Sequence, residues 1–361
     1  MKTTPSFSAY YPFILFICIS PLTIDALMSG ILFHVGRNSM WFAMPVVSIL
    51  LAGLYCTQRV CVQRGAASLL QVCEDSLRPW MLKIVYLLLG LALLETVIWY
   101  NISSADFISK TLMYGSEKSP LCLFLIITVT MSLLPIESHA RYAHLMMLVS
   151  APIYVIISLI GFRNIHWNYV LPSYSMQELQ RIDIAAANLL FMFSPLAAIP
   201  LINAGDKQQM RISFHAAAVI VLVCASYECY MQMLGIGIFG IHTAQKFVHL
   251  SQYIINSVRV ENFIIDRMIF FGILLWTLTF VGTVPFLLRM GLFALCKTIG
   301  IRFSKITLLV GGVLVSGLIL LTGSRITVQK GVVLFGYTDL LVIVIIPMCL
   351  YLTTLRKGNR Q

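Results

Sequence analysis

About ten apolar stretches constrain the fold of this chain more than any other feature. They lie at roughly 10–35, 40–57, 80–108, 120–138, 143–161, 184–203, 212–236, 263–289, 304–323 and 334–355. A helix of about 20 mostly apolar residues is long enough to cross the ~30 Å hydrocarbon core of a bilayer. The connections between the stretches are too short to hold a separate soluble domain. We therefore predict one all-α integral membrane domain over residues 1–361, surrounded by the lipid bilayer.

Composition and charge exclude several classes of protein. Hydrophobic residues make up 59% of the chain and charged residues 11%, and the mean hydropathy is +0.89, a balance that soluble domains do not have. The formal charge of +11 is dispersed, without a basic cluster interleaved with aromatic residues, so we expect no nucleic-acid partner. Most of the 25 lysine and arginine residues fall in connections that an internal amino terminus would place in the cytosol, which predicts that both termini are cytosolic.

The sequence carries no pattern typical of an enzyme. It has no phosphate-binding loop, no dinucleotide fingerprint, no hydrolase elbow and no zinc-protease motif. The nine cysteines are scattered through apolar segments without metal-ligand spacing. We expect no enzymatic activity, no cofactor and no metal site.

The same tripeptide interrupts two of the apolar stretches at their midpoints. It occurs as Ser20-Pro21-Leu22 in the first stretch and as Ser194-Pro195-Leu196 in the sixth, 174 residues apart. Proline removes a helical hydrogen bond, and in lipid the freed groups need protein, water or a ligand as partners. Breaks at corresponding positions of two halves indicate the binding site of an inverted-repeat transporter fold. The alternative is that each break is a proline kink packed against its neighbours.

A ligand site at the two breaks follows from their chemistry. The half-helix after Pro21 would present the positive end of its dipole to a carboxylate, and carbonyls near Phe193 and Ser194 would suit an ammonium group or a cation. Ionisable groups at membrane depth are costly and therefore functional candidates, and they include Glu228 and Asp339. The predicted ligand-binding residues are Ser20, Pro21, Leu22, Thr23, Asp25, Glu95, Phe193, Ser194, Pro195 and Leu196.

Two connections are amphipathic. Residues 58–79 place Leu69, Leu70, Val72 and Cys73 on one stripe, which predicts a segment lying at the inner interface. In the external stretch 237–262, Thr243 is a candidate cap for a helix over 243–258 that carries Phe247, Leu250, Ile254 and Val258 on one face. That helix is either a lid or a cover of the bundle.

Four local patterns together resemble the spore germination permeases, the B subunits of GerA-type germinant receptors, within the amino acid–polyamine–organocation (APC) transporter superfamily. The patterns are Gly36-Arg37 with Trp41, Ser68-Leu69-Leu70 with Glu74, Asn168 to Pro172, and Phe263, Arg267 and Trp276. Where that family has a glycine-rich first break, this chain has Ser20 to Thr23. The germinant and any ion coupling therefore stay open.

The resemblance implies a LeuT/APC-like bundle of about ten spans. It would consist of inverted five-helix repeats, at about 10–161 and about 184–323 with the last helix at about 334–355, and its first and sixth helices would be broken. Asp266, Arg267 and Trp276 are assigned structural or gating roles. The resemblance also implies A-type and C-type receptor subunits as partners, and the spore inner membrane as the location.

Three functions are compatible with these observations. The leading one is a germinant-sensing subunit that binds a small nutrient, with an amino acid as the expected ligand, and signals to its partners. The alternative is an amino-acid transporter coupled to H⁺ or Na⁺, which would use the same pocket. The third is a scaffold that binds no ligand.

Overall fold

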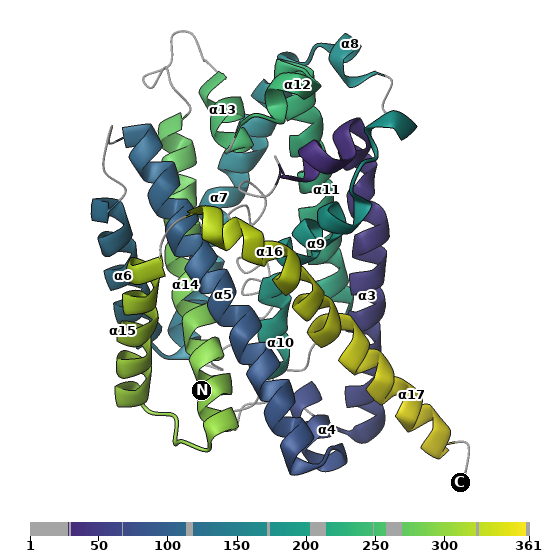
Figure 1. Ribbon diagram of the computed structural model, residues 1–361, viewed down its shortest axis with the longest axis vertical. Helices are drawn as coiled ribbons and strands as arrows, with labels where there is room; N and C mark the ends of the chain where they lie inside the picture. The colour runs from purple at the N-terminus through teal and green to yellow at the C-terminus, as the bar shows by residue number, and fades with distance from the viewer. Residues whose placement is uncertain are drawn as a thin grey trace, which may run out of the picture.

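The computed structural model describes residues 28, 30–66, 68–112, 118–171, 174–202, 214–247, 249–257, 269–322 and 325–358. Every element in this part of the chain is helical (Figure 1). The chain runs from a helical stretch at 30–35 through η2 (Gly36–Asn38), α3 (Ser39–Arg64), α4 (Leu69–Ser76), α5 (Pro79–Leu112), α6 (Lys118–Ser132), α7 (Ile136–Arg163), α8 (Trp167–Val170) and η3 (Met176–Glu178). It continues with α9 (Ile182–Met192), η4 (Ser194–Ala198), α10 (Ile199–Ile202), α11 (Phe214–Phe239), α12 (Ile241–Ala244), α13 (Leu250–Ser257), α14 (Ile269–Ile299), α15 (Lys305–Thr322), α16 (Arg325–Leu340), the π-helical turn η5 (Leu341–Ile345) and α17 (Ile346–Gly358).

The long helices confirm an all-α integral membrane protein. Within the described ranges, six helices are long and apolar enough to cross a bilayer, and the bent α9–α10 segment adds a seventh. Two shorter apolar helices, α6 and α15, accompany them. The second to tenth predicted stretches each fall on these helices, while most of the first lies outside the described residues.

Apolar side chains on the outer helices face outward. Leu148 and Leu159 of α7 are 61% and 66% exposed, and Leu314 and Leu321 of α15 are 69% and 87% exposed. Exposed leucines at this density suit a hydrocarbon solvent and would be unusual on the surface of a soluble domain.

Helices α5 and α14 form an antiparallel pair at the centre of the bundle (Figure 1). Glycines let the two backbones approach closely. A β-carbon on Gly90 would lie 3.3 Å from the carbonyl oxygen of Gly291, and one on Gly291 would lie 3.4 Å from that of Gly90. Close approach at small residues is a common way for helices to pack in membranes, where van der Waals contact rather than hydrophobic burial holds them together.

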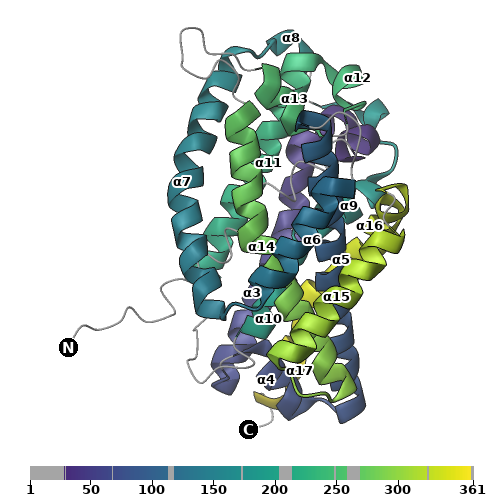
Figure 2. The ribbon, with the colours of Figure 1, turned by 90° about the vertical axis from the view of Figure 1, so that its left-hand side faces the viewer.

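The ends of the bundle carry the short helices. In both views α4 lies at one end, and α8, α12 and α13 lie at the other (Figures 1 and 2). Gly65, at φ 62°, ends α3, and the amide of Ala66 donates to the carbonyl of Cys61 at 2.9 Å. The Ser68 hydroxyl then caps α4 by accepting from the Gln71 amide at 3.2 Å. As predicted, Leu69, Leu70, Val72 and Cys73 are the buried face of α4.

The stretch 237–262 differs from its prediction. One helix capped by Thr243 was expected, but the chain forms α12 and α13, and Thr243 lies inside α12. Gly240, at φ 75°, begins α12 without a side-chain cap because a left-handed residue turns the chain out of α11. Leu250 and Ile254 of α13 are buried as predicted, and Phe247 stacks on Tyr253 with ring centroids 3.9 Å apart. Val258 lies outside the described residues.

Candidate functional site

The sixth predicted span is broken at the proline tripeptide, as predicted. α9 and the η4–α10 segment are bent by 49° relative to each other. Pro195 supplies no amide, so the helix cannot continue with α-helical spacing, and Ser194 to Ala198 adopt a 3₁₀ turn instead. Ser194, Leu196, Ala197 and Ala198 are each at most 1% exposed.

One prediction about this break is wrong. The carbonyl of Phe193 was expected to be open to an ammonium group or a cation, but it accepts the Leu196 amide at 2.9 Å. The Phe193 amide in turn donates to the Leu190 carbonyl at 3.0 Å. The 3₁₀ turn therefore uses the Phe193 carbonyl, which an unwound break would have offered to a ligand.

The hydroxyl of Ser194 is the polar feature of the break. It lies 2.7 Å from the hydroxyl of Thr96 on α5. Thr96 has one hydroxyl proton, and it donates to the Ala92 carbonyl at 2.9 Å. Either hydroxyl could donate by geometry alone, and we assign Ser194 as the donor because both hydroxyl protons are then used. Both residues are 0% exposed, so this single hydrogen bond joins the broken span to the central helix inside the protein.

Glu95 lies next to Thr96 and is 8% exposed. Its strongest electrostatic neighbour is Asp339 of α16, which is 1% exposed. The two residues come from helices that pack together where α16 crosses α5 (Figure 1). Glu95 was predicted as a site residue; Asp339 was noted only as an acid at membrane depth, because spacing along the chain cannot place it beside Glu95.

α16 reaches this position by packing closely against α9. A β-carbon on Gly336 would lie 2.8 Å from the carbonyl carbon and 2.9 Å from the α-carbon of Ala187. Trp99 of α5 also contacts α9, meeting Phe191 edge-on with ring centroids 6.0 Å apart. Among the described elements, α5 and α16 therefore enclose the span that carries the break.

The described end of the first predicted span also lies against α9. A β-carbon on Gly30 would lie 3.1 Å from the side-chain nitrogen of Asn188. The first break itself lies outside the described residues, and so do five predicted site residues: Ser20, Pro21, Leu22, Thr23 and Asp25.

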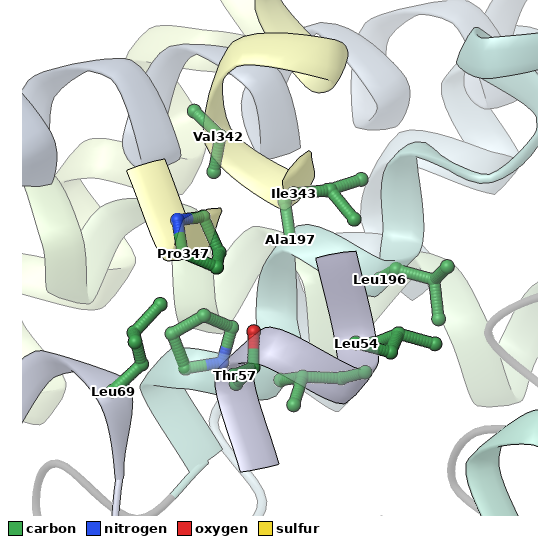
Figure 3. Close-up of a pocket in the computed structure, with 10 residues that line it drawn as sticks. Leu54, Thr57, Leu69, Leu196, Ala197, Val342, Ile343 and Pro347 are labelled. Carbon is green, nitrogen blue, oxygen red and sulfur yellow. The ribbon is translucent and has the colours of Figure 1, made fainter. Parts of the chain in front are cut away.

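A narrow cavity lies beside the break, toward α4. Its volume is about 10 Å³, roughly the space of one water molecule. Leu196 and Ala197 of η4 line it together with Leu54 and Thr57 of α3, and Ile343 of η5 and Leu69 of α4 also contribute (Figure 3). The lining is almost entirely apolar, and Thr57 supplies its side-chain hydroxyl.

The predicted gating residue Trp276 lies in a different cluster. Its indole nitrogen donates to the Ser104 hydroxyl at 3.0 Å, and its ring stacks on Phe107 with centroids 4.3 Å apart. Ser104 is eight residues after Thr96, or about 12 Å along α5 at 1.5 Å per residue. Trp276 therefore contacts α5 about two helical turns beyond Thr96. Asp266 and Arg267 lie outside the described residues.

An ion-paired cluster beside Trp276 was not predicted. Asp106 of α5 lies 2.9 Å from His249 Nε2 and 2.8 Å from the Lys110 ammonium. His249 directly precedes α13, and Gln252 of α13 donates to Thr111 of α5. These contacts tie α13 to the end of α5. The sequence signal was available, since Asp106 and Lys110 are four residues apart on one helix, but the partner on α13 could not be identified from spacing.

Comparisons with known proteins identify the fold. The chain is similar to crystal structures of a manganese transporter from Eremococcus coleocola. Two single-residue mutants of that transporter each give a TM-score of 0.54 at 12% identity, covering 94% of this chain and 78% of theirs. No protein-family model and no curated protein sequence matches the chain. At this identity the likeness concerns the fold alone: the chain has the all-helical fold of LeuT/APC-type membrane transporters.

Proposed function

We propose that this chain binds a small nutrient at the break between α9 and α10, and that it acts as the nutrient-sensing subunit of a spore germinant receptor. An amino acid is the expected ligand. The observation that carries the binding site is the Ser194–Thr96 hydroxyl pair at a 49° bend inside a span. Transporters of this fold bind their substrates at broken helices near the middle of the membrane.

Sensing is supported by the order and spacing of the four sequence patterns that resemble the germination permeases. Among the described residues, the cavity beside the break has room for about one water molecule. In the proposed mechanism, a ligand binds after η4 and α10 move away from α5. Ser194 and Thr96 would then exchange their mutual hydrogen bond for bonds to the ligand.

Such a movement is what a sensor requires. A ligand shifts a conformational equilibrium only through its different affinities for the two states. A site that is filled in one state and open in the other has this difference built in. The partner subunits would respond to the changed position of α10 and α16, and the ligand would not have to cross the membrane.

The second candidate is an amino-acid transporter coupled to H⁺ or Na⁺. Two observations favour it: the shared fold with a membrane transporter and the buried acidic residues Glu95 and Asp339. Both functions use the same pocket, so the discriminating measurement is accumulation. Uptake of labelled amino acids into vesicles that contain the purified chain, without other subunits, would support transport and overturn sensing as the sole role.

The binding site is tested by filling it. Ser194→Trp adds bulk at a residue that is fully buried, whereas Ser48→Trp makes the same change at an exposed position of α3. We expect spores that carry Ser194→Trp to lose or shift their nutrient response, and spores that carry Ser48→Trp to respond normally. Immunoblots must show equal levels of the chain and its partners. A normal response from Ser194→Trp at normal protein level would refute the pocket.

A further inference from the structure

We infer that Glu95 of α5 and Asp339 of α16 form a proton-binding site, which keeps a proton while the two helices are packed together and releases it when they separate. The inference deepens the proposed function, because the pair lies beside the proposed nutrient site. It does not depend on which nutrient binds there.

The burial of both carboxyl groups and their lack of partners among the described residues carry the argument. Glu95 and Asp339 are 8% and 1% exposed, so each side chain is more than nine-tenths buried. Glu95 Oε2 and both carboxyl oxygens of Asp339 have no hydrogen-bond partner among the described residues. An ionised carboxylate without partners in a low-dielectric interior is very unfavourable, and two that repel each other are worse. At least one of these carboxyl groups should therefore be protonated.

No positive charge in the described part of the chain offsets the pair. η4 and η5, which pack against α5, contain no titratable side chain. Asp183 at the start of α9 is paired with Arg181 at 3.0 Å. Arg289 of α14 donates to the Ser132 carbonyl at 3.2 Å and lies over the Phe303 ring, on the side of α14 that faces α6 and α15.

The remaining titratable groups on elements packed against α5 and α16 are engaged elsewhere or lie at helix ends. Glu74 of α4 accepts the Tyr86 hydroxyl at 2.9 Å, and Lys110 pairs with Asp106. Lys118 and Lys305 are exposed at the starts of α6 and α15, and Tyr337 of α16 is 45% exposed. Asp339 is accordingly the charged group that acts on Glu95.

A proton fits this site better than a metal cation. Hard cations need about six or more oxygen ligands in a cage. Within the described residues, no group of three or more His, Cys, Asp or Glu side chains could hold a metal ion. A proton needs no such cage, because a single carboxyl oxygen can hold it by a covalent O–H bond.

The backbone next to Asp339 suggests how proton release would move α16. Asp339 is followed after one residue by the π-helical turn η5, in which the Ile346 amide donates to the Leu341 carbonyl. Pro347 cannot donate to Ile343, which interrupts the α-helical pattern at this point. Single π-helical turns often mark functional positions. On release, one O–H bond breaks, the proton passes to water, and the two carboxylates repel each other, which would drive α16 away from α5 at this turn.

The test detects the protonated carboxyl groups directly. Dicyclohexylcarbodiimide, an apolar reagent, reacts with protonated carboxyl groups in membrane interiors. We expect the full-length purified chain, in lipid nanodiscs at about neutral pH, to be labelled on the peptide that carries Glu95 or the one that carries Asp339. The infrared C=O stretching band of a protonated carboxyl group should be present in the same sample.

Variants then assign the signal. Glu95→Gln with Asp339→Asn should abolish both the labelling and the infrared band, while Asp183→Asn, a matched change of an exposed ion-paired aspartate, should change neither. Peptide mapping of the unmodified chain gives the same assignment if the double variant does not fold. Absence of label and band from the unmodified chain would overturn the inference. So would saturable binding of Na⁺ or Mn²⁺ that the double variant loses.

The outcomes separate this inference from the proposed function. Labelling detects the protonated carboxyl groups of Glu95 and Asp339, whereas the germination response of Ser194→Trp tests nutrient binding. A labelled pair together with a normal Ser194→Trp response would refute the nutrient pocket and leave the proton site standing.

Discussion

The hydrogen bond between Ser194 and Thr96 leads to a prediction with an unusual asymmetry. We assign Ser194 as the donor and Thr96 as the acceptor, because the only hydroxyl proton of Thr96 then goes to the Ala92 carbonyl. Ser194→Ala removes the donor and leaves Thr96 still bonded to Ala92. Thr96→Val removes the acceptor and leaves a buried hydroxyl without a partner.

The two changes should therefore differ in their effect on the free energy of unfolding. A net intramolecular hydrogen bond contributes about 0.5–1.5 kcal/mol, and interhelical bonds in membranes average about 0.6 kcal/mol. We expect Ser194→Ala to cost an amount in that range. Leaving a buried donor unsatisfied costs about 1–3 kcal/mol, so Thr96→Val should cost more. The double variant should resemble Ser194→Ala, since no hydroxyl is then orphaned.

The assay is reversible unfolding of the purified chain in mixed micelles, with denaturing detergent as the variable and all four proteins compared as a double-mutant cycle. The coupling energy should exceed the ~0.3–0.5 kcal/mol within which distant sites add. Coupling below that limit would refute the bond. A larger cost for Ser194→Ala than for Thr96→Val would refute its direction.

Three further predictions follow from packing and burial. Gly336→Ala should lower the free energy of unfolding by about 1–3 kcal/mol, because its β-carbon would overlap the backbone of Ala187; Gly317→Ala, where nothing lies within 4 Å, is the thermal-melt control and should not destabilise. His249→Ala should speed amide hydrogen exchange in α13 but not in α14, since α13 loses its contact with Asp106; unchanged exchange would show that apolar packing alone holds α13. Burial raises the pKa of Cys73 from 9.0 to about 12. The contribution of the protonated thiol to the free energy of unfolding is therefore fully present below pH 9 and is lost as the pH rises toward 12. Fast alkylation of the Cys73 thiol in folded protein at pH 8 would contradict this.

The positions of the spans and the break in the sixth span could be predicted from sequence, because both depend on local properties. Hydropathy indicates whether a segment is surrounded by lipid or by water. Pro195 interrupts the helix because it lacks an amide hydrogen, whatever the tertiary structure around it. The use of the Phe193 carbonyl could not be predicted, since it depends on the chain choosing a 3₁₀ turn over an unwound break. Thr243 was a reasonable cap by residue type, but Gly240 set the start of α12 three residues earlier.

The contacts that assemble the site depend on tertiary structure. Glu95 was identified from its depth in a span, whereas its neighbour Asp339 is 244 positions later and on a helix that crosses at an angle. Trp276 was grouped with the gate by its motif, yet its ring packs on Phe107, well away from the break. A hydropathy pattern identifies the polar residues that lie within spans, but it does not predict which of them contact one another.

The close pairing of α5 with α14 has a consequence for any experiment on motion in this protein. The two helices pack closely at Gly90 and Gly291 near one end, and through the Phe107–Trp276 ring stack near the other. These points are 17 residues apart on α5, or about 25 Å, which is most of the hydrocarbon thickness. The pair can therefore serve as an internal ruler: spin labels placed on α5 and α14 should report a constant separation, and a label on α10 or α16 measured against either helix should report the displacement.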